Sequence, residues 1–297
     1  MLTEHISPRY ADLDSWSSLE MIEAMYEGQL AAAAAVRGVL KAIAAAVDDA
    51  VPALRRGGRM VYAGAGTSGR IGVQDGSELL PSYGWPAERL IFLMAGGLGA
   101  VVRSVEGAED DEAQGSRAVA DAGIGADDVV IGIAASGTTP FTMGVLRAAS
   151  AAGAVTIALA NNADAPLLAV ARHGIMVDTG TEVVAGSTRM KAGTAQKIVL
   201  NLISTSIMVK LGRVYRGMMV HMRASNVKLR RRAERMVSRI VGCSEADAAR
   251  LVKRGDGDVK TAVLLGFGLA EAEAAAALQR HGGNLRLAIK ESVDSHG

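Results

Sequence analysis

The stretch from Arg59 to Arg70 constrains this chain more than any other, because an apolar run leads directly into a glycine-rich turn. The run Met60-Val-Tyr-Ala-Gly64 is typical of a short buried strand, and Gly64-Ala-Gly-Thr-Ser-Gly69 follows it. Glycines let the backbone approach a ligand, and a helix that begins in the turn would direct its positive end to the same place. The sequence therefore predicts an anion site formed by Gly66, Thr67, Ser68 and Gly69.

The same glycine spacing, GxGxxG, also occurs in dinucleotide-binding folds, where an Asp or Glu about 20 residues later holds the ribose. Here the next strand, Arg89-Leu-Ile-Phe-Leu-Met94, ends in Ala95-Gly-Gly97 without an acid. A nicotinamide cofactor is therefore the weakest interpretation. A phosphate site and a plain tight turn explain the glycines equally well.

A second strand, Asp128-Val-Val-Ile-Gly-Ile-Ala134, leads into another hydroxyl-rich turn, Ala135-Ser-Gly-Thr-Thr-Pro140. Pro140 suits the first turn of a helix, because its fixed backbone angle is helical and it has no N–H to satisfy. Two such turns suggest that one phosphate is held from two sides, although an ordinary βα loop explains the second turn as well.

Strand-like and helix-like segments alternate through the first two thirds of the chain. Strands are expected at 59–63, 89–94, 128–133, 154–160 and 174–177, and helices at 68–80, within 98–121 and at 140–152. This alternation predicts an α/β protein with a doubly wound parallel sheet, which binds ligands at the carboxyl ends of its strands. Both hydroxyl-rich turns fall at those ends.

A helical pattern precedes the sheet. It begins at Ser17 or Ser18, breaks near Gly28 and continues to about Leu54. Its alanine-rich faces permit close packing, so we expect it to cover the sheet or a partner subunit.

A long helix is predicted from Ser187 to Leu211, with Ser187 and Thr188 as caps. Arg189 and Lys191 would oppose the helix dipole so near its start. Either an anion or a carboxylate lies nearby, or the two cations form surface salt bridges. No strand pattern follows Arg216, and residues 243–291 are typical of a compact helical appendage.

Composition excludes several classes of function. The 297 residues are 49% apolar and carry a formal net charge of +1, so neither nucleic acid nor an anionic membrane is an expected partner. The only cysteine is Cys243, and the five histidines lack ligand spacing, so a catalytic metal is not expected. The first 14 residues have no signal-peptide pattern, which makes the cytoplasm the expected location.

Two stretches offer candidate carboxylates. Glu78 follows Gly72 and Gly76, which weaken a helix by about 1 kcal/mol each and so indicate a close approach of another backbone or a ligand. Glu106 and Glu109 lie in a polar loop after the second strand. Exposed carboxylates are usually only solvated, but two of them beside one bound sugar can divide acid and base work. The sequence alone leaves both interpretations open.

Motifs along nearly the whole chain resemble the N-acetylmuramic acid 6-phosphate etherases, a family built on the sugar isomerase (SIS) fold. They are Thr3-Glu4, Leu13-Asp14, Ser18-Leu-Glu20, Gly64 to Arg70, Asp75 to Glu78, Val105-Glu-Gly-Ala-Glu-Asp110, Gly132-Ile-Ala-Ala-Ser-Gly137, Glu182-Val-Val184, Gly186-Ser-Thr-Arg-Met-Lys-Ala-Gly-Thr-Ala-Gln-Lys197, Asn226 and Lys228-Leu229. The resemblance implies a helical segment at 1–54, a phosphosugar-binding SIS domain at 55–218, and a C-terminal helical region at 219–297 that holds a bundle similar to ubiquitin-associated domains.

The resemblance also implies a reaction, in which the D-lactyl ether of the sugar is cleaved by elimination and water is then added. Glu78 corresponds to the catalytic acid and Glu109 to the second carboxylate. Neither a metal nor a nicotinamide cofactor is implied. The residues implied to bind the phosphorylated amino sugar are Ser68, Ser136, Gly137 and Thr139, with Ser187 and Lys191 near them and Lys228 contributed by the neighbouring subunit of a homodimer with shared sites.

Among the positions where the chain departs from the family pattern, four bear on sugar preference. Thr138 stands where an Arg is usual, Gln74 and Gly76 replace Leu and Ala around Asp75, and His221 replaces an Asp. These changes leave an altered sugar preference open. Two other functions share the architecture, namely a phosphosugar sensor that resembles the glucokinase regulatory protein and an aldose–ketose isomerase.

Overall fold

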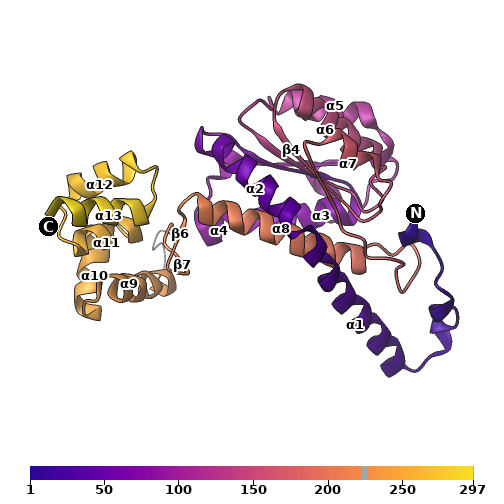
Figure 1. Ribbon diagram of the computed structural model, residues 1–297, viewed down its shortest axis with the longest axis horizontal. Helices are drawn as coiled ribbons and strands as arrows, with labels where there is room; N and C mark the ends of the chain where they lie inside the picture. The colour runs from indigo at the N-terminus through magenta and orange to yellow at the C-terminus, as the bar shows by residue number, and fades with distance from the viewer. Residues whose placement is uncertain (223–226, 297) are drawn as a thin grey trace. The chain divides into compact units, whose positions relative to one another are not determined.

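The computed structural model describes residues 1–222 and 227–296 (Figure 1). Two compact units divide the chain. The first contains Met1–Ser77 and Glu88–Ser204, and the second contains Glu78–Ala87 and the chain from Thr205 onward. The three domains predicted from the sequence have other limits and stay a prediction.

The first unit is built on a parallel sheet of five strands in the order β2-β1-β3-β4-β5. The strands are β1 (Met60–Gly64), β2 (Leu90–Met94), β3 (Val129–Ile133), β4 (Val155–Ala160) and β5 (His173–Met176). Every residue of β1, β3 and β4 is buried, as expected for strands that helices cover on both faces. The prediction of an α/β fold with a doubly wound parallel sheet is confirmed, and each strand lies within one residue of its expected limits.

Helices cover both faces of this sheet (Figure 1). The helices of the unit are α1 (Ser18–Ala35), α2 (Leu40–Arg55), α3 (Gly66–Ser77), α5 (Glu112–Asp121), α6 (Pro140–Ala151), α7 (Pro166–Val170) and the first part of α8 (Lys191–Lys210). One face packs α5 and α6 against Val61, Ala63 and Val130. The opposite face carries Tyr62 and Ile133, which contact α3 where Gly72 leaves room for them.

The glycines of α3 therefore serve packing between the helix and the sheet. A Cβ atom at Gly72 would lie 2.9 Å from Ile133 Cδ1, and one at Gly76 would lie 2.6 Å from Phe92 Cε1. Such distances are shorter than any van der Waals contact, so only glycine lets α3 come this close. The sequence predicted that another backbone or a ligand comes close to Gly72 and Gly76. In the structure, the groups that come close are side chains of the sheet.

Some helix limits in the first unit differ from the expected ones. The break near Gly28 is wrong, because α1 runs through it and ends at Ala35, where the 3-10 turn Val36–Val39 follows. A Cβ at Gly28 would lie 3.3 Å from Val183 Cγ2, so this glycine serves packing. The helix expected at 68–80 begins at Gly66 and ends at Ser77. The predicted cap is confirmed at Ser17, which forms a capping box with Glu20.

In its described residues, the second unit is helical except for one short hairpin. Its elements are α4 (Leu79–Tyr83), β6 (Val214–Tyr215), β7 (Met218–Met219), α9 (Val227–Val241), α10 (Glu245–Arg254), α11 (Val259–Gly266), α12 (Glu271–Arg280) and α13 (Leu285–His296). The expectation of no strand after Arg216 is wrong, because Arg216 and Gly217 adopt positive φ angles and turn the chain into β7. The core of this unit includes the buried Val252, Val263, Leu264 and Leu285, and Leu278 and Ile289 pack against it.

Arg213 connects residues 78–87 to the rest of the second unit. Its guanidinium donates to the carbonyls of Tyr83 and Gly84, at 2.7 Å each, and lies over the ring of Trp85. Gly84 ends α4 in the left-handed conformation, and a Cβ there would lie 2.4 Å from the carbonyl oxygen of His221. The segment that begins with Glu78 is thus fixed within its own unit.

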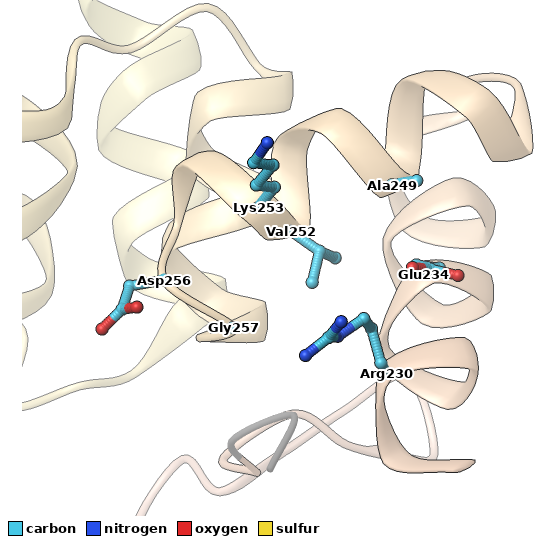
Figure 2. A pocket seen from close by; sticks show the side chains of 7 residues that line it. All are labelled: Arg230, Glu234, Ala249, Val252, Lys253, Asp256 and Gly257. Carbon is cyan, nitrogen blue, oxygen red and sulfur yellow. The ribbon is translucent and has the colours of Figure 1, made fainter. Parts of the chain in front are cut away.

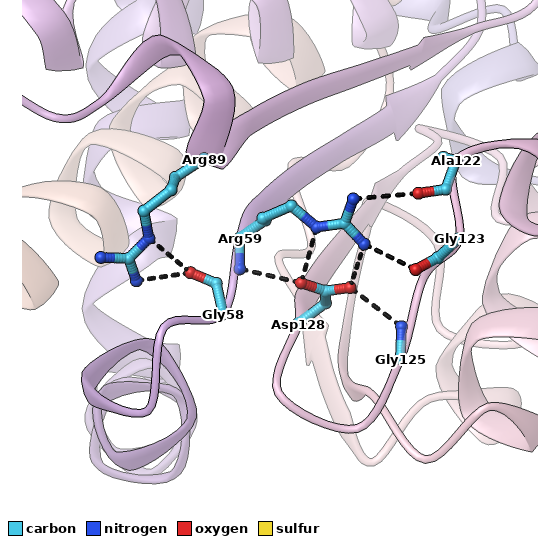
Figure 3. Close-up of polar contacts among 7 residues, drawn as sticks. All are labelled: Gly58, Arg59, Arg89, Ala122, Gly123, Gly125 and Asp128. Carbon is cyan, nitrogen blue, oxygen red and sulfur yellow. Dashed lines mark hydrogen bonds and ion pairs between the residues drawn. The ribbon is translucent and has the colours of Figure 1, made fainter.

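One ion pair fixes the amino ends of β1 and β3 (Figure 3). Arg59 donates from Nε and Nη2 to the two carboxylate oxygens of Asp128, at 3.0 and 2.7 Å, and its backbone N–H donates to the same carboxylate at 2.8 Å. Nη1 and Nη2 also donate to the carbonyls of Ala122 and Gly123. Burial disfavours the charged carboxylate, but the hydrogen bonds from Arg59 and from the Gly125 N–H leave the pKa of Asp128 below its usual value.

We expect Asp128→Ala to lower the free energy of unfolding by about 2–4 kcal/mol at pH 7, since it leaves Arg59 partly buried without its counter-ion. A carboxyl with a lowered pKa stabilises the fold above its unfolded-state pKa and loses that effect as the pH falls through its folded-state pKa. The difference from wild type should therefore shrink below about pH 4. Urea unfolding at several pH values measures both effects.

Asp127→Ala is the matched control. Asp127 pairs with Arg56 at 2.6 Å, but about half of each side chain is exposed, so its loss should cost about 0–1 kcal/mol. Equal destabilisation by the two substitutions would contradict a special role for Asp128.

Candidate active site

The two hydroxyl-rich turns line one cavity of about 420 Å³ in the first unit. It lies at the carboxyl ends of β1 and β3. Among its described lining are six residues predicted for the site, namely Gly66, Thr67, Ser68, Glu109, Ser136 and Thr139. The neighbouring Thr138 and Thr188 line it as well. The structure thus brings together predicted site residues that are up to 73 positions apart, between Gly66 and Thr139.

The first turn begins α3 directly at the end of β1. Gly66 has a φ of +51°, and the N–H of Gly69 donates to the carbonyl of Ala65 at 3.0 Å, which closes the first helical turn. The N–H groups of Gly66, Thr67 and Ser68 precede that bond and have no partner within the helix. Gly69 itself has a packing role, because a Cβ there would lie 2.8 Å from the carbonyl oxygen of Gly64.

The second turn holds its hydroxyls in a fixed arrangement. Ser136 Oγ accepts hydrogen bonds from the N–H and from the hydroxyl of Thr138, at 3.2 and 3.1 Å. Gly137 has a φ of +69°, and a Cβ there would lie 2.2 Å from Ala165 Cβ, so only glycine fits. Helix α6 follows with Thr139 as its N-cap residue and Pro140 in its first turn, as the sequence predicted.

Glu109 reaches the cavity from a loop that Arg70 anchors. Arg70, in α3, donates to the carbonyls of Ala100 and Val101 and to Ser104 Oγ, at 3.0 Å each. Glu109 lies in the 3-10 turn Ala108–Asp110, is exposed, and lines the main cavity and a second one of about 370 Å³ beside it. Glu106 lines only the second cavity.

The expected start of the long helix at Ser187 is wrong, because α8 begins at Lys191. The buried carboxylate of Glu182 accepts hydrogen bonds from the N–H groups of Lys191 and Ala192, at 2.9 Å each. Glu182 thus caps the start of α8 through backbone N–H groups, a role that sequence reasoning did not assign to it. Lys191 Nζ donates to the carbonyl of Thr181, and Ser187 lies in the turn before the helix.

Asp75 is a second residue that sequence reasoning did not single out. It is buried, and its carboxylate accepts hydrogen bonds from Tyr62 in β1 at 2.8 Å and from Ser204 in α8 at 3.2 Å. Burial raises the pKa of Asp75 against the opposing effect of these hydrogen bonds. Its place in the motif from Asp75 to Glu78 was the available signal, and the structure assigns it to holding α3 on the sheet.

The other predicted site residues lie in the second unit. Glu78 is exposed and directly precedes α4, and Lys228 is exposed at the start of α9. Their place relative to the cavity stays a proposal, and Asn226 lies outside the described residues. His221 is half-buried, and burial together with the charges of Lys260 and Arg213 lowers its pKa to about 3, so its ring is neutral at pH 7.

The second unit has a cavity of its own, of about 470 Å³, beside α9 and α10 (Figure 2). Its described lining includes charges of both signs, with Arg230 and Glu234 from α9, Lys253 from α10 and Asp256 after it. None of these residues was predicted for the site. Over residues 1–222 and 227–296, no three His, Cys, Asp or Glu side chains are grouped as metal ligands, and the expected metal-free reaction stays a prediction.

A parallel five-stranded sheet with two hydroxyl-rich turns on one cavity is a SIS domain. The model of the SIS domain matches residues 106–206, and that of the glucokinase regulatory protein N-terminal SIS domain matches residues 42–150. A phosphoheptose isomerase from Francisella tularensis has the same fold at 21% identity, with a TM-score of 0.50 over 65% of this chain and 98% of that one.

Curated relatives define the family. The N-acetylmuramic acid 6-phosphate etherase of Deinococcus radiodurans is 50% identical over 291 residues, which cover 97% of this chain and 95% of that protein. The etherase of Yersinia pestis (strain Pestoides F) is 45% identical over 290 residues, which cover 97% and 98%. This chain belongs to the N-acetylmuramic acid 6-phosphate etherase family, as its motifs predicted.

Proposed function

We propose that this protein cleaves the D-lactyl ether of N-acetylmuramic acid 6-phosphate and yields N-acetylglucosamine 6-phosphate and D-lactate, a step in the recycling of cell-wall amino sugars. The observation that carries the proposal is 50% identity to a curated etherase along 97% of the chain. The cavity adds a physical reason, because its two turns offer the donors that a sugar phosphate requires.

The phosphate is proposed to bind between the two turns. The first turn supplies the unpaired N–H groups of Gly66, Thr67 and Ser68 at the positive end of α3, and a phosphate dianion is favoured there. The second turn adds the hydroxyls of Ser136 and Thr139. Ser187 and Lys191 are proposed to contact the substrate from the turn before α8. Thr138 supplies a hydroxyl where the family usually places a cation, which bears on sugar preference.

The carboxylates are proposed to carry the elimination. In the open-chain sugar the aldehyde acidifies the C2 proton, so a carboxylate can remove it, and the C3–O bond then breaks with its electron pair on the lactate oxygen. The other carboxyl group supplies the proton that this oxygen takes up. Water then adds at C3, and its proton returns to C2. Glu78 and Glu109 are the pair assigned to these transfers.

Glu78→Gln should lower kcat for D-lactate release by about 10²- to 10⁴-fold, because a general acid or base supplies a factor of this size. The KM for N-acetylmuramic acid 6-phosphate should change little, since the amide keeps the shape of the side chain. Glu245→Gln, at an exposed position of α10, is the control and should behave as wild type. A folded wild-type protein that releases no D-lactate would disprove the proposed function.

A homodimer with shared sites is proposed on the basis of two surfaces. Helix α1 exposes an apolar row on the side opposite its buried Ala24, Gly28 and Ala32, formed by Leu19, Ile22, Tyr26 and Leu30. These side chains are 53–65% exposed, and a second copy would remove them from water. Helix α9 exposes Lys228, Arg230, Arg231, Arg232 and Arg235, which fit the acidic site of a neighbouring subunit better than a solvated surface.

The stretch Ser18–Arg55 is apolar and long enough to cross a bilayer, by length and composition. In the structure it consists of α1 and α2 with the 3-10 turn Val36–Val39 between them, and α2 buries its apolar face against the sheet. Packing against the core, together with the proposed second subunit, would account for its composition. We keep a cytoplasmic protein without membrane or nucleic-acid partners as part of the proposal.

Mixing two inactive variants tests the shared site. If Lys228 completes the site of the other subunit, a dimer of Lys228→Ala and Glu78→Gln chains has one site with both lesions and one with neither. Exchange of subunits should then restore D-lactate release at the intact site of each mixed dimer. No recovery, with exchange verified by differently tagged chains, would place each site within a single chain.

A phosphosugar sensor is the second candidate, favoured by the match of residues 42–150 to the glucokinase regulatory protein N-terminal SIS domain. A sensor requires the cavity but not the acid and base. It predicts binding of the sugar phosphate in calorimetry without release of D-lactate, so the same assay separates the two candidates.

A further inference from the structure

We propose that Glu4 is a third carboxylate of the site, which positions the sugar by accepting hydrogen bonds from its hydroxyl or amide donors. The inference rests on the proposed function, because it assigns a role toward the same sugar phosphate. Glu4 lies in the 3-10 turn Leu2–Glu4 and lines the cavity together with Ser68, Glu109 and Ser136.

The turn that carries Glu4 is fixed by its neighbour Thr3, which is 1% exposed. The carbonyl oxygen of Thr3 accepts a hydrogen bond from the N–H of Gly186 at 2.9 Å, and its hydroxyl accepts one from Asn162 Nδ2 at 3.2 Å. Asn162 Nδ2 also donates to the carbonyl of Ala135, in the second turn of the site, at 2.8 Å. Thr3 therefore ties residues 1–4 to two segments that border the cavity.

The carboxylate of Glu4 lies over Gly186. A Cβ at this glycine would be 2.8 Å from Glu4 Oε2, and Gly186 has a φ of +75°, so the carboxylate occupies space that only glycine leaves free. Over the described ranges 1–222 and 227–296, the carboxylate has no hydrogen-bond donor and no ion-pair partner. The buried Thr3 thus anchors the turn, and the unpaired carboxylate of Glu4 beside it lines the cavity. A carboxylate held in this way is placed to contact a ligand.

The chemistry of the ligand decides what such a carboxylate can bind. The dianionic phosphate monoester of the sugar has no protons to donate and is repelled by a carboxylate, so Glu4 cannot serve the phosphate turns. The sugar carries hydroxyl groups and an acetamide N–H, which are donors that a carboxylate accepts strongly. Glu4 therefore recognises the hydroxyl and amide donors of the sugar, while the two turns hold the phosphate.

Calorimetry with two ligands tests this division. Glu4→Ala should weaken the binding of N-acetylglucosamine 6-phosphate by about 10- to 100-fold, as the loss of a hydrogen bond to a charged group predicts. Its affinity for inorganic phosphate should equal that of wild type or exceed it slightly. Glu4→Gln keeps one acceptor oxygen and should show a smaller loss. Asp12→Asn, at another exposed acid of the same N-terminal region, is the control and should bind both ligands as wild type does.

Each other outcome overturns the inference. Equal losses for the two ligands would show that Glu4 only supports the cavity, and unchanged binding of the sugar phosphate would show that it does not touch the sugar. Both results leave the proposed function intact, because wild type still binds and turns over its substrate. A wild-type protein that does not bind the sugar phosphate at all would instead overturn the proposed function together with this inference.

Discussion

The contact of α3 with the end of β1 is the constraint on which the site depends. Gly64 and Gly69 face each other so closely that a Cβ at Gly69 would lie 2.8 Å from the Gly64 carbonyl oxygen. This approach places the unpaired N–H groups of the first helical turn at the cavity, and Gly72 and Gly76 continue it along the helix. The proposed phosphate site is therefore a consequence of how closely the helix packs on the sheet.

Buried carboxylates hold the frame around this contact, and the carboxylates proposed to act on the substrate are exposed. Asp128 pairs with Arg59 at the amino ends of β1 and β3, away from the cavity at their carboxyl ends. Asp75 joins α3 to β1, and Glu182 caps α8. Each accepts at least two hydrogen bonds, which offset the cost of burying its charge. Glu78, Glu109 and Glu4 are exposed and remain open to a ligand.

The sequence predicted the sheet and both turns well, because continuous apolar runs and local glycine geometry determine them. It erred where distant contacts decide. Gly28 continues α1 because the helix packs against Val183, and α8 starts at Lys191 because Glu182, nine residues earlier, reaches its first N–H groups. Glu4 was not assigned to the site although Thr3-Glu4 is one of the family motifs, because the turn is brought to the cavity by hydrogen bonds of Thr3 to Gly186 and Asn162, which are distant in sequence.

The direct test of the account is the fate of solvent oxygen when the protein acts on N-acetylmuramic acid 6-phosphate in ¹⁸O-labelled water. Elimination breaks the C3–O bond, so mass spectrometry should find the label at C3 of N-acetylglucosamine 6-phosphate and none in the D-lactate hydroxyl. Label in that hydroxyl would mean that the bond on the lactyl side breaks instead. That result would contradict the proposed elimination and the role assigned to the carboxylates.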